Sequence, residues 1–205
     1  MNIRVKGNTV EIEGYVNSVE RLSKVLHDRL GDFVERVKVG AFKRALERAE
    51  DVRILLNHEW TRDLGGTADG NLELYEDAIG LHARATIEDE EVAEQARRGE
   101  LRGWSFGFND RDVEQGEENG LVVRNVKDLD LYEVSLINRE KIPAYDGTLV
   151  AVRSKDDRVL NISDVIESEL NVRVEEEPKE EEPNAPGAID YTEYHKIIED
   201  MKGEK

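Results

Sequence analysis

The sequence of 205 residues contains no cysteine and only four prolines, and its basic side chains are far outnumbered by acidic ones. Without cysteine the chain cannot form disulfides, thiolate metal sites or a cysteine nucleophile. Lysine and arginine total 29 against 47 aspartate and glutamate residues, which gives a net charge of -18. This charge argues against nucleic acid as the main partner, because phosphate binding needs a basic surface.

Long apolar segments are absent as well. No run approaches the roughly 20 apolar residues that a membrane-spanning helix needs. The N-terminal residues Met1–Asn8 lack the apolar core of a secretory signal. We therefore expect a protein that has no membrane partner and stays in the compartment where it is made.

Proline and charge together mark a boundary near the C-terminus. The segment 175–183 contains six glutamates and a single lysine, and such a segment cannot supply a hydrophobic core. We predict one folded domain over residues 1–154 and an acidic, largely disordered tail over 155–205. Four apolar residues near the end of the tail share one helical face, so residues 189–202 form either a short docking helix or a marginal helix that frays in water.

Strand patterns outnumber helical ones in the predicted domain. Alternation predicts a strand over 8–16 and two strands within 71–87. Helices are predicted over 40–50 and 89–98, the second with an acidic first turn and a glycine directly after it. This balance indicates a β-rich α+β fold rather than alternating βαβ units.

Two polar residues fall on inward faces of predicted strands. Alternation through Val52–Trp60 places His58 on the apolar face. In Leu101–Phe108, Ser105 lies on one face between two glycines, which leaves room for another backbone to approach. A structural core histidine and an ordinary strand serine are the alternative interpretations.

A carboxylate completes the set. Alternation through Asp128–Ile137 places Glu133 among apolar neighbours, where an ionised carboxylate needs a partner. A structural salt bridge is one interpretation, and an acid that orients a histidine is the other, with Asp130 as the second candidate. Together with His58 and Ser105, such an acid would supply nucleophile, base and orienting group. One histidine and one glutamate make a poor ligand set, so we expect neither a metal nor another cofactor.

The segment Gly103–Gly107 also matches the G-x-S-x-G pattern of α/β-hydrolases. In that fold a helix follows the serine directly, and the triad order is serine, acid, histidine. Here residues 109–120 predict a charged hairpin loop, and the one histidine after Ser105 is His195. An esterase of that class is therefore disfavoured.

The chain resembles the tailed-phage prohead maturation proteases, which are relatives of the herpesvirus assemblin proteases. The resemblance runs from about Gly14 to Ala151. It rests on a set of short motifs: Glu35–Val37, Gly40–Phe42, Leu55–His58, Leu72–Leu74, Gly80–Leu81, Gly99–Phe108 and Tyr132–Ile137. It implies a serine endopeptidase built on a small closed β-barrel flanked by short helices, which acts inside the assembling procapsid in the host cytoplasm.

The resemblance also implies roles for individual residues. Ser105 would be the nucleophile, His58 the general base and Glu133 the third member. Assemblins use a second histidine there, and His82 could substitute only with a different geometry. Arg139 is a candidate for the oxyanion hole through its backbone N–H, or else a solvated loop charge.

The implied partners are the major capsid protein, with its scaffolding segment, and the internal scaffold. Self-cleavage of the tail and self-association into a dimer or larger oligomer are left open by the resemblance. The alternative function is a non-catalytic scaffold or capsid-assembly protein that keeps the protease fold.

Overall fold

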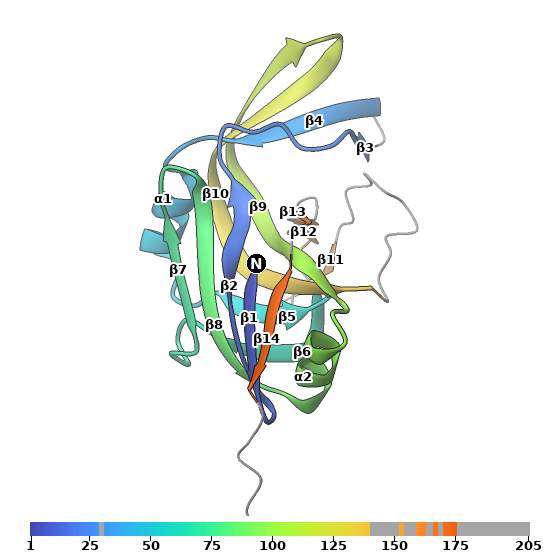
Figure 1. Ribbon diagram of the computed structural model, residues 1–205. Helices are drawn as coiled ribbons and strands as arrows, with labels where there is room; N and C mark the ends of the chain where they lie inside the picture. The colour runs from blue at the N-terminus through green and yellow to red at the C-terminus, as the bar shows by residue number, and fades with distance from the viewer. Residues whose placement is uncertain (29–30, 140–151, 154–158, 163–165, 168–169, 176–205) are drawn as a thin grey trace, which may run out of the picture.

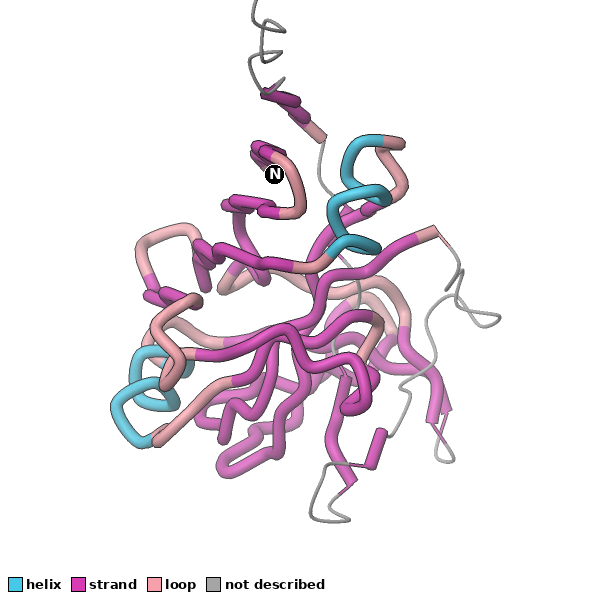
Figure 2. Tube along the Cα trace, turned by 90° about the horizontal axis from the view of Figure 1, so that it is seen from below, coloured by secondary structure: helices cyan, strands magenta, loops and turns pink. Residues whose placement is uncertain are grey.

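The computed structural model describes residues 1–28, 31–139, 152–153, 159–162, 166–167 and 170–175. These residues form two β-sheets that pack against each other, with two short helices at the periphery (Figures 1 and 2). The predicted docking helix at 189–202 lies outside the described residues, as does the acidic stretch from 176 onward. Within the described part of the chain, no helix is long and apolar enough to cross a membrane.

The first sheet has five strands in the order β14–β1–β2–β8–β7. In that order the strands are Asn171–Glu175, Asn2–Lys6, Thr9–Ser18, Gly80–Glu88 and Leu72–Glu76. Strand β1 runs antiparallel to β2 and parallel to β14. The strands predicted over 8–16 and within 71–87 are confirmed as β2, β7 and β8.

The second sheet has nine strands and is built around the antiparallel pair β9 and β10. Its main path is β11 (Val152–Arg153), β12 (Val159–Ile162), β9 (Leu101–Glu118), β10 (Leu121–Asn138), β4 (Gly31–Val37) and β3 (Leu26–Asp28). Off this path lie β13 (Ile166–Glu167), β5 (Arg53–Leu56) and β6 (Glu59–Gly66). Strand β13 pairs with β9, while β5 lies between β10 and β6.

The main hydrophobic core lies between the two sheets. Strand β9 contributes Trp104, Phe106 and Phe108, none of which has exposed surface. Helix α1 (Ala41–Arg48) adds Phe42, whose ring centre lies 5.2 Å from that of Phe106 in an edge-to-face arrangement. The aromatic face of β9 is therefore fixed in the core, which leaves its other face for the site described below.

Helix α2 (Glu90–Arg97) has the ends that its sequence predicts. The Asp89 carboxylate accepts a hydrogen bond of 2.9 Å from the Val92 N–H and so caps the first turn. Gly99 follows the helix with φ at 64°, a left-handed conformation that favours glycine. Both predicted helices, over 40–50 and 89–98, are confirmed.

The closed barrel expected from the resemblance is not found in the described residues. There, the outer strands β7 and β14 of the first sheet each pair on one side, and no strand pairing joins the two sheets. The apolar faces are buried by packing one sheet on the other, an arrangement that needs no closure.

The charged segment 109–120 is not the loop that was predicted. Strand β9 continues to Glu118, and the turn consists of Asn119 and Gly120, with φ at 54° and 79°. Positive φ at both central residues defines a two-residue type I′ hairpin, whose strands project beyond the core in Figure 1. Strand β9 continues directly after Ser105, where an α/β-hydrolase has a helix.

The sheets also extend into the region that was assigned to the tail. Strands β12 and β13 pair with β9, and β14 pairs with β1, with Val172 opposite Ile3. Val172 packs against the main core. Strand β14 thus lies in the first sheet as far as Glu175, beyond the boundary predicted at residue 154.

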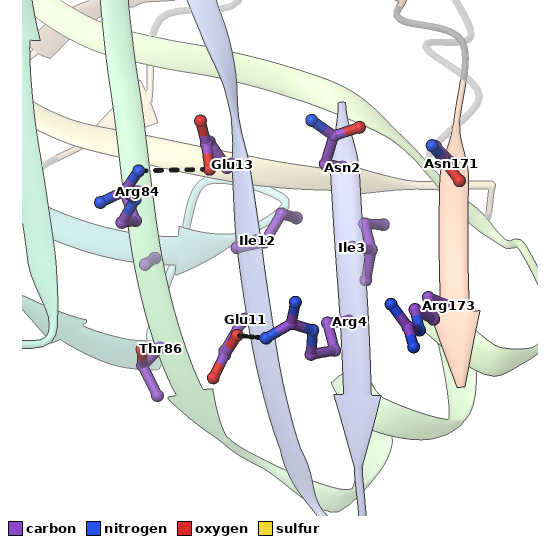
Figure 3. Close-up of a pocket in the computed structure, with 11 residues that line it drawn as sticks. Asn2, Ile3, Arg4, Glu11, Ile12, Glu13, Arg84, Thr86, Asn171 and Arg173 are labelled. Atoms are coloured by element: carbon purple, nitrogen blue, oxygen red, sulfur yellow. Dashed lines mark hydrogen bonds and ion pairs between the residues drawn. The ribbon is translucent and has the colours of Figure 1, made fainter. Parts of the chain in front are cut away.

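The outer face of the first sheet carries a shallow polar groove (Figure 3). Its floor runs across β14, β1, β2 and β8, and two ion pairs cross it, Arg4 with Glu11 at 3.2 Å and Arg84 with Glu13 at 3.4 Å. The lining includes no residue of the predicted triad.

We expect Val172→Asp to lower the free energy of unfolding by about 1–3 kcal/mol, because it places a charge against the core. Val174, on the same strand, is 47% exposed, so Val174→Asp should change that free energy by less than about 0.5 kcal/mol. Urea unfolding of both variants checks this. Equal, negligible effects would show that β14 is not part of the folded unit.

Candidate active site

Ser105 lies in the buried first half of β9, in register with polar residues of β10. Ser105 is directly opposite Ser135, and Gly107 is directly opposite Glu133. Opposed residues of an antiparallel pair project to the same face of the sheet. Ser105, Ser135 and Glu133 therefore share one face, while Trp104 points to the core on the other. All three polar residues are buried, and Ser105 has no exposed surface.

A β-bulge at Tyr132 brings Glu133 to this face. Leu131 pairs with Phe108, whereas Glu133 pairs with Gly107, so Tyr132 is left over between them. The strict alternation predicted for this strand is therefore wrong across the bulge: Leu129 and Leu131, predicted on the face of Glu133, lie on the core face with Phe108. The extra residue reverses the direction of every side chain that follows it.

Gly107 makes room for the carboxylate. A Cβ atom at this position would collide with Oε1 of Glu133. The space beside Ser105 that the sequence suggested for another backbone is thus occupied, on this side, by the Glu133 side chain. We infer that a glycine is needed at 107 because the acid packs over the neighbouring strand.

His58 lies in a tight turn, which differs from the continuous strand predicted over 52–60. Strand β5 ends at Leu56 and β6 begins at Glu59. Between them, Asn57 and His58 have φ at 56° and 61°, the backbone of a type I′ turn. Asparagine adopts this conformation readily, whereas histidine does so less often than the glycine usually found at the second position.

The turn brings His58 to Glu133. Its Nδ1 lies 2.8 Å from Glu133 Oε1. The histidine side chain is 11% exposed and the glutamate side chain 1% exposed. This geometry allows Nδ1–H to donate to the carboxylate and leaves Nε2 able to accept a proton. The structure therefore pairs His58 with Glu133, on the strand face of β9 and β10 that also holds Ser105.

Ser135 is a member of this group that sequence reasoning did not assign. Its hydroxyl donates to Glu133 Oε2 at 2.5 Å and accepts from the His58 N–H at 3.1 Å. The available signal was its position two residues after Glu133, on the same strand face.

A chain of buried amide side chains supports the turn, and it too was missed. The Asn57 side chain donates to Asn138 Oδ1 at 3.0 Å and accepts from the Asn138 N–H at 3.1 Å. Asn138 Nδ2 then donates to Gln95 of α2 at 3.1 Å. Each of the three amides is at most 7% exposed. Because buried amides are costly without partners, this chain ties the turn to the end of β10 and to α2.

Three other candidates lie elsewhere or are engaged. Both oxygens of Asp130 accept from Arg111, at 3.0 and 3.1 Å, so this acid belongs to a surface ion pair. His82 is in β8 of the first sheet, away from the site. The Arg139 N–H donates to the Glu100 carbonyl at 3.0 Å. The assignment of that N–H to an oxyanion hole is therefore wrong for this conformation, because its donor is already used.

No group of three or more His, Asp or Glu side chains that could hold a metal ion occurs in the described ranges. The shared face of β9 and β10 and the adjoining β5–β6 turn carry a hydroxyl, a carboxylate and an imidazole, which are the groups that acyl transfer uses.

A family model described as caudovirus prohead serine protease matches residues 1–161. The match includes Ser105, His58 and Glu133, and it spans most of both sheets. No curated protein matches the chain, and no solved structure does.

We expect Asn57→Ala and Asn57→Gly to lower the free energy of unfolding by about 1–3 kcal/mol, because each leaves buried partners of the amide unsatisfied. Alanine should cost about 1 kcal/mol more than glycine, since alanine also resists a left-handed backbone. Urea unfolding measures both. If glycine proved as destabilising as alanine, the turn would not depend on the conformation of residue 57.

Proposed function

Because the chain belongs to the caudovirus prohead serine proteases, we propose that Ser105, His58 and Glu133 form its catalytic triad. The observation that carries this proposal is the 2.8 Å contact between His58 Nδ1 and Glu133 Oε1. It lies on the strand face that also holds Ser105. Nucleophile, base and orienting acid thus come from β9, the β5–β6 turn and β10.

The proposed reaction is acyl transfer to the serine. His58 Nε2 takes the Ser105 proton as Oγ attacks the peptide carbonyl, and the imidazolium then gives that proton to the leaving amine. Glu133 holds the proton on Nδ1 and stabilises the imidazolium. Water subsequently hydrolyses the acyl-enzyme with His58 again acting as base, and the serine is regenerated.

Access to the serine is a further requirement of this mechanism. Ser105 has no exposed surface, so a peptide carbonyl reaches its Oγ only after the surrounding chain opens. Local opening of this kind admits a small fluorophosphonate as well as a peptide.

We propose that the substrates are the scaffolding segment of the major capsid protein and the internal scaffold, cut inside the procapsid in the host cell. Family membership supports this role in head maturation. Self-cleavage and self-association belong to the same proposal, as does a distant relation to the herpesvirus assemblins. The buried polar site argues for catalysis over a purely scaffolding role, since such groups are costly to keep.

Labelling with a small fluorophosphonate tests the triad. We expect covalent modification at Ser105 in the wild type and none in His58→Ala, because the serine is a weak nucleophile without its base. Peptide mapping by mass spectrometry locates the label. Modification at another serine, or at Ser105 in both proteins equally, would contradict the assignment.

The same labelling separates the two acids. Glu133→Gln should slow the reaction severely, by up to about 10⁴-fold, since the acid fixes the imidazole tautomer. Asp130→Asn is the matched control: it alters a surface ion pair with Arg111 and should have little effect. The reverse order would move the acid to Asp130.

A further inference from the structure

The Ser135 hydroxyl lies between two members of the proposed triad and contacts both. It donates to Glu133 Oε2 at 2.5 Å and accepts from the His58 N–H at 3.1 Å. Building on the proposed function, we propose that Ser135 is the positioning residue of the triad: it holds the Glu133 carboxylate and the turn carrying His58 in their reactive arrangement.

The first part of this role concerns the carboxylate. Glu133 Oε1 contacts His58, and Glu133 Oε2 contacts Ser135. With one partner on each oxygen, rotation of the carboxylate breaks both hydrogen bonds together. Glu133 and Ser135 are at most 1% exposed, so water cannot replace a lost partner without local opening. The hydroxyl therefore fixes the orientation in which Oε1 faces the imidazole.

The second part concerns the histidine backbone. His58 has φ at 61°, a left-handed conformation that costs free energy in residues other than glycine. The bond from its N–H to Ser135 Oγ joins the turn to β10 at this residue. Ser135 thus stabilises the left-handed backbone of His58, the residue whose backbone sets the position of the imidazole. The Ser135 hydroxyl both donates a hydrogen bond, to Glu133, and accepts one, from His58.

The third part concerns the nucleophile. Ser135 is directly opposite Ser105 in the β9–β10 register, and opposed Cβ atoms are typically about 4.5–5.5 Å apart. The residue that anchors the acid and the base is therefore the cross-strand neighbour of the serine. The Ser135 hydroxyl thus contacts the acid and the base, and Ser135 lies opposite the serine.

The rate of fluorophosphonate labelling at Ser105 tests this role, because positioning and simple packing predict opposite changes. If the Ser135 hydroxyl only stabilised the fold, Ser135→Ala would loosen the buried strand and expose Ser105, so labelling would be unchanged or faster. If it positions the triad, we expect the maximal labelling rate to fall by about 10- to 100-fold. The reagent concentration giving half that rate should stay the same.

Two further variants complete the test. Ser135→Thr keeps the hydroxyl and should label at most of the wild-type rate. This variant keeps the test valid if Ser135→Ala folds poorly. Ser23→Ala is the matched control: its hydroxyl also accepts a backbone N–H, from Glu35 at 2.9 Å, but it lies in another part of the fold. It should label at the wild-type rate.

The outcomes separate this inference from the function on which it rests. Wild type that is not labelled at Ser105 contradicts the proposed triad itself. Wild type that is labelled, with Ser135→Ala as fast or faster, overturns the role of Ser135 and leaves the triad intact. A threonine variant as slow as the alanine variant also overturns it, because the hydroxyl would then not be the group required.

Discussion

The pairing of β9 with β10 is the constraint on which the site depends. Its register sets Ser105 against Ser135 and Gly107 against Glu133, and the bulge at Tyr132 turns the acid away from the core. A slip of one residue would send these side chains to the opposite face. The aromatic residues of β9 hold the register, because their burial between the sheets would be lost if the strand moved.

The site is polar and buried, and the groups around Glu133 and the β5–β6 turn are joined to one another by hydrogen bonds. The carboxylate of Glu133 has His58 on one oxygen and Ser135 on the other. Asn57 supplies the left-handed backbone that the turn requires and is bonded in turn to Asn138. Buried polar groups stabilise a single arrangement only when all are satisfied.

Much of this could be predicted from local sequence, and the remainder depends on non-local pairing. Alternation and capping predicted both helices and the strands β2, β7 and β8 of the first sheet, since these depend on neighbours in the chain. His58 and Glu133 were singled out because each interrupts an apolar face, and Ser105 because two glycines flank it on its face of the strand. The turn at His58, the bulge and the use of the Arg139 N–H were not predictable, because they follow from which strands pair. The expected closed barrel, which the described residues do not form, also depends on which strands pair.

Intact mass spectrometry of the major capsid protein from the same phage, co-expressed with this chain, tests the central claim most directly. The account predicts that wild type removes a segment from the capsid protein and that Ser105→Ala leaves it at full length, although the two proteins fold alike. Cleavage by both proteins would contradict the account, because another group would then be the nucleophile. Full-length capsid protein in both would also contradict it, and would favour an assembly protein that keeps the fold without the reaction.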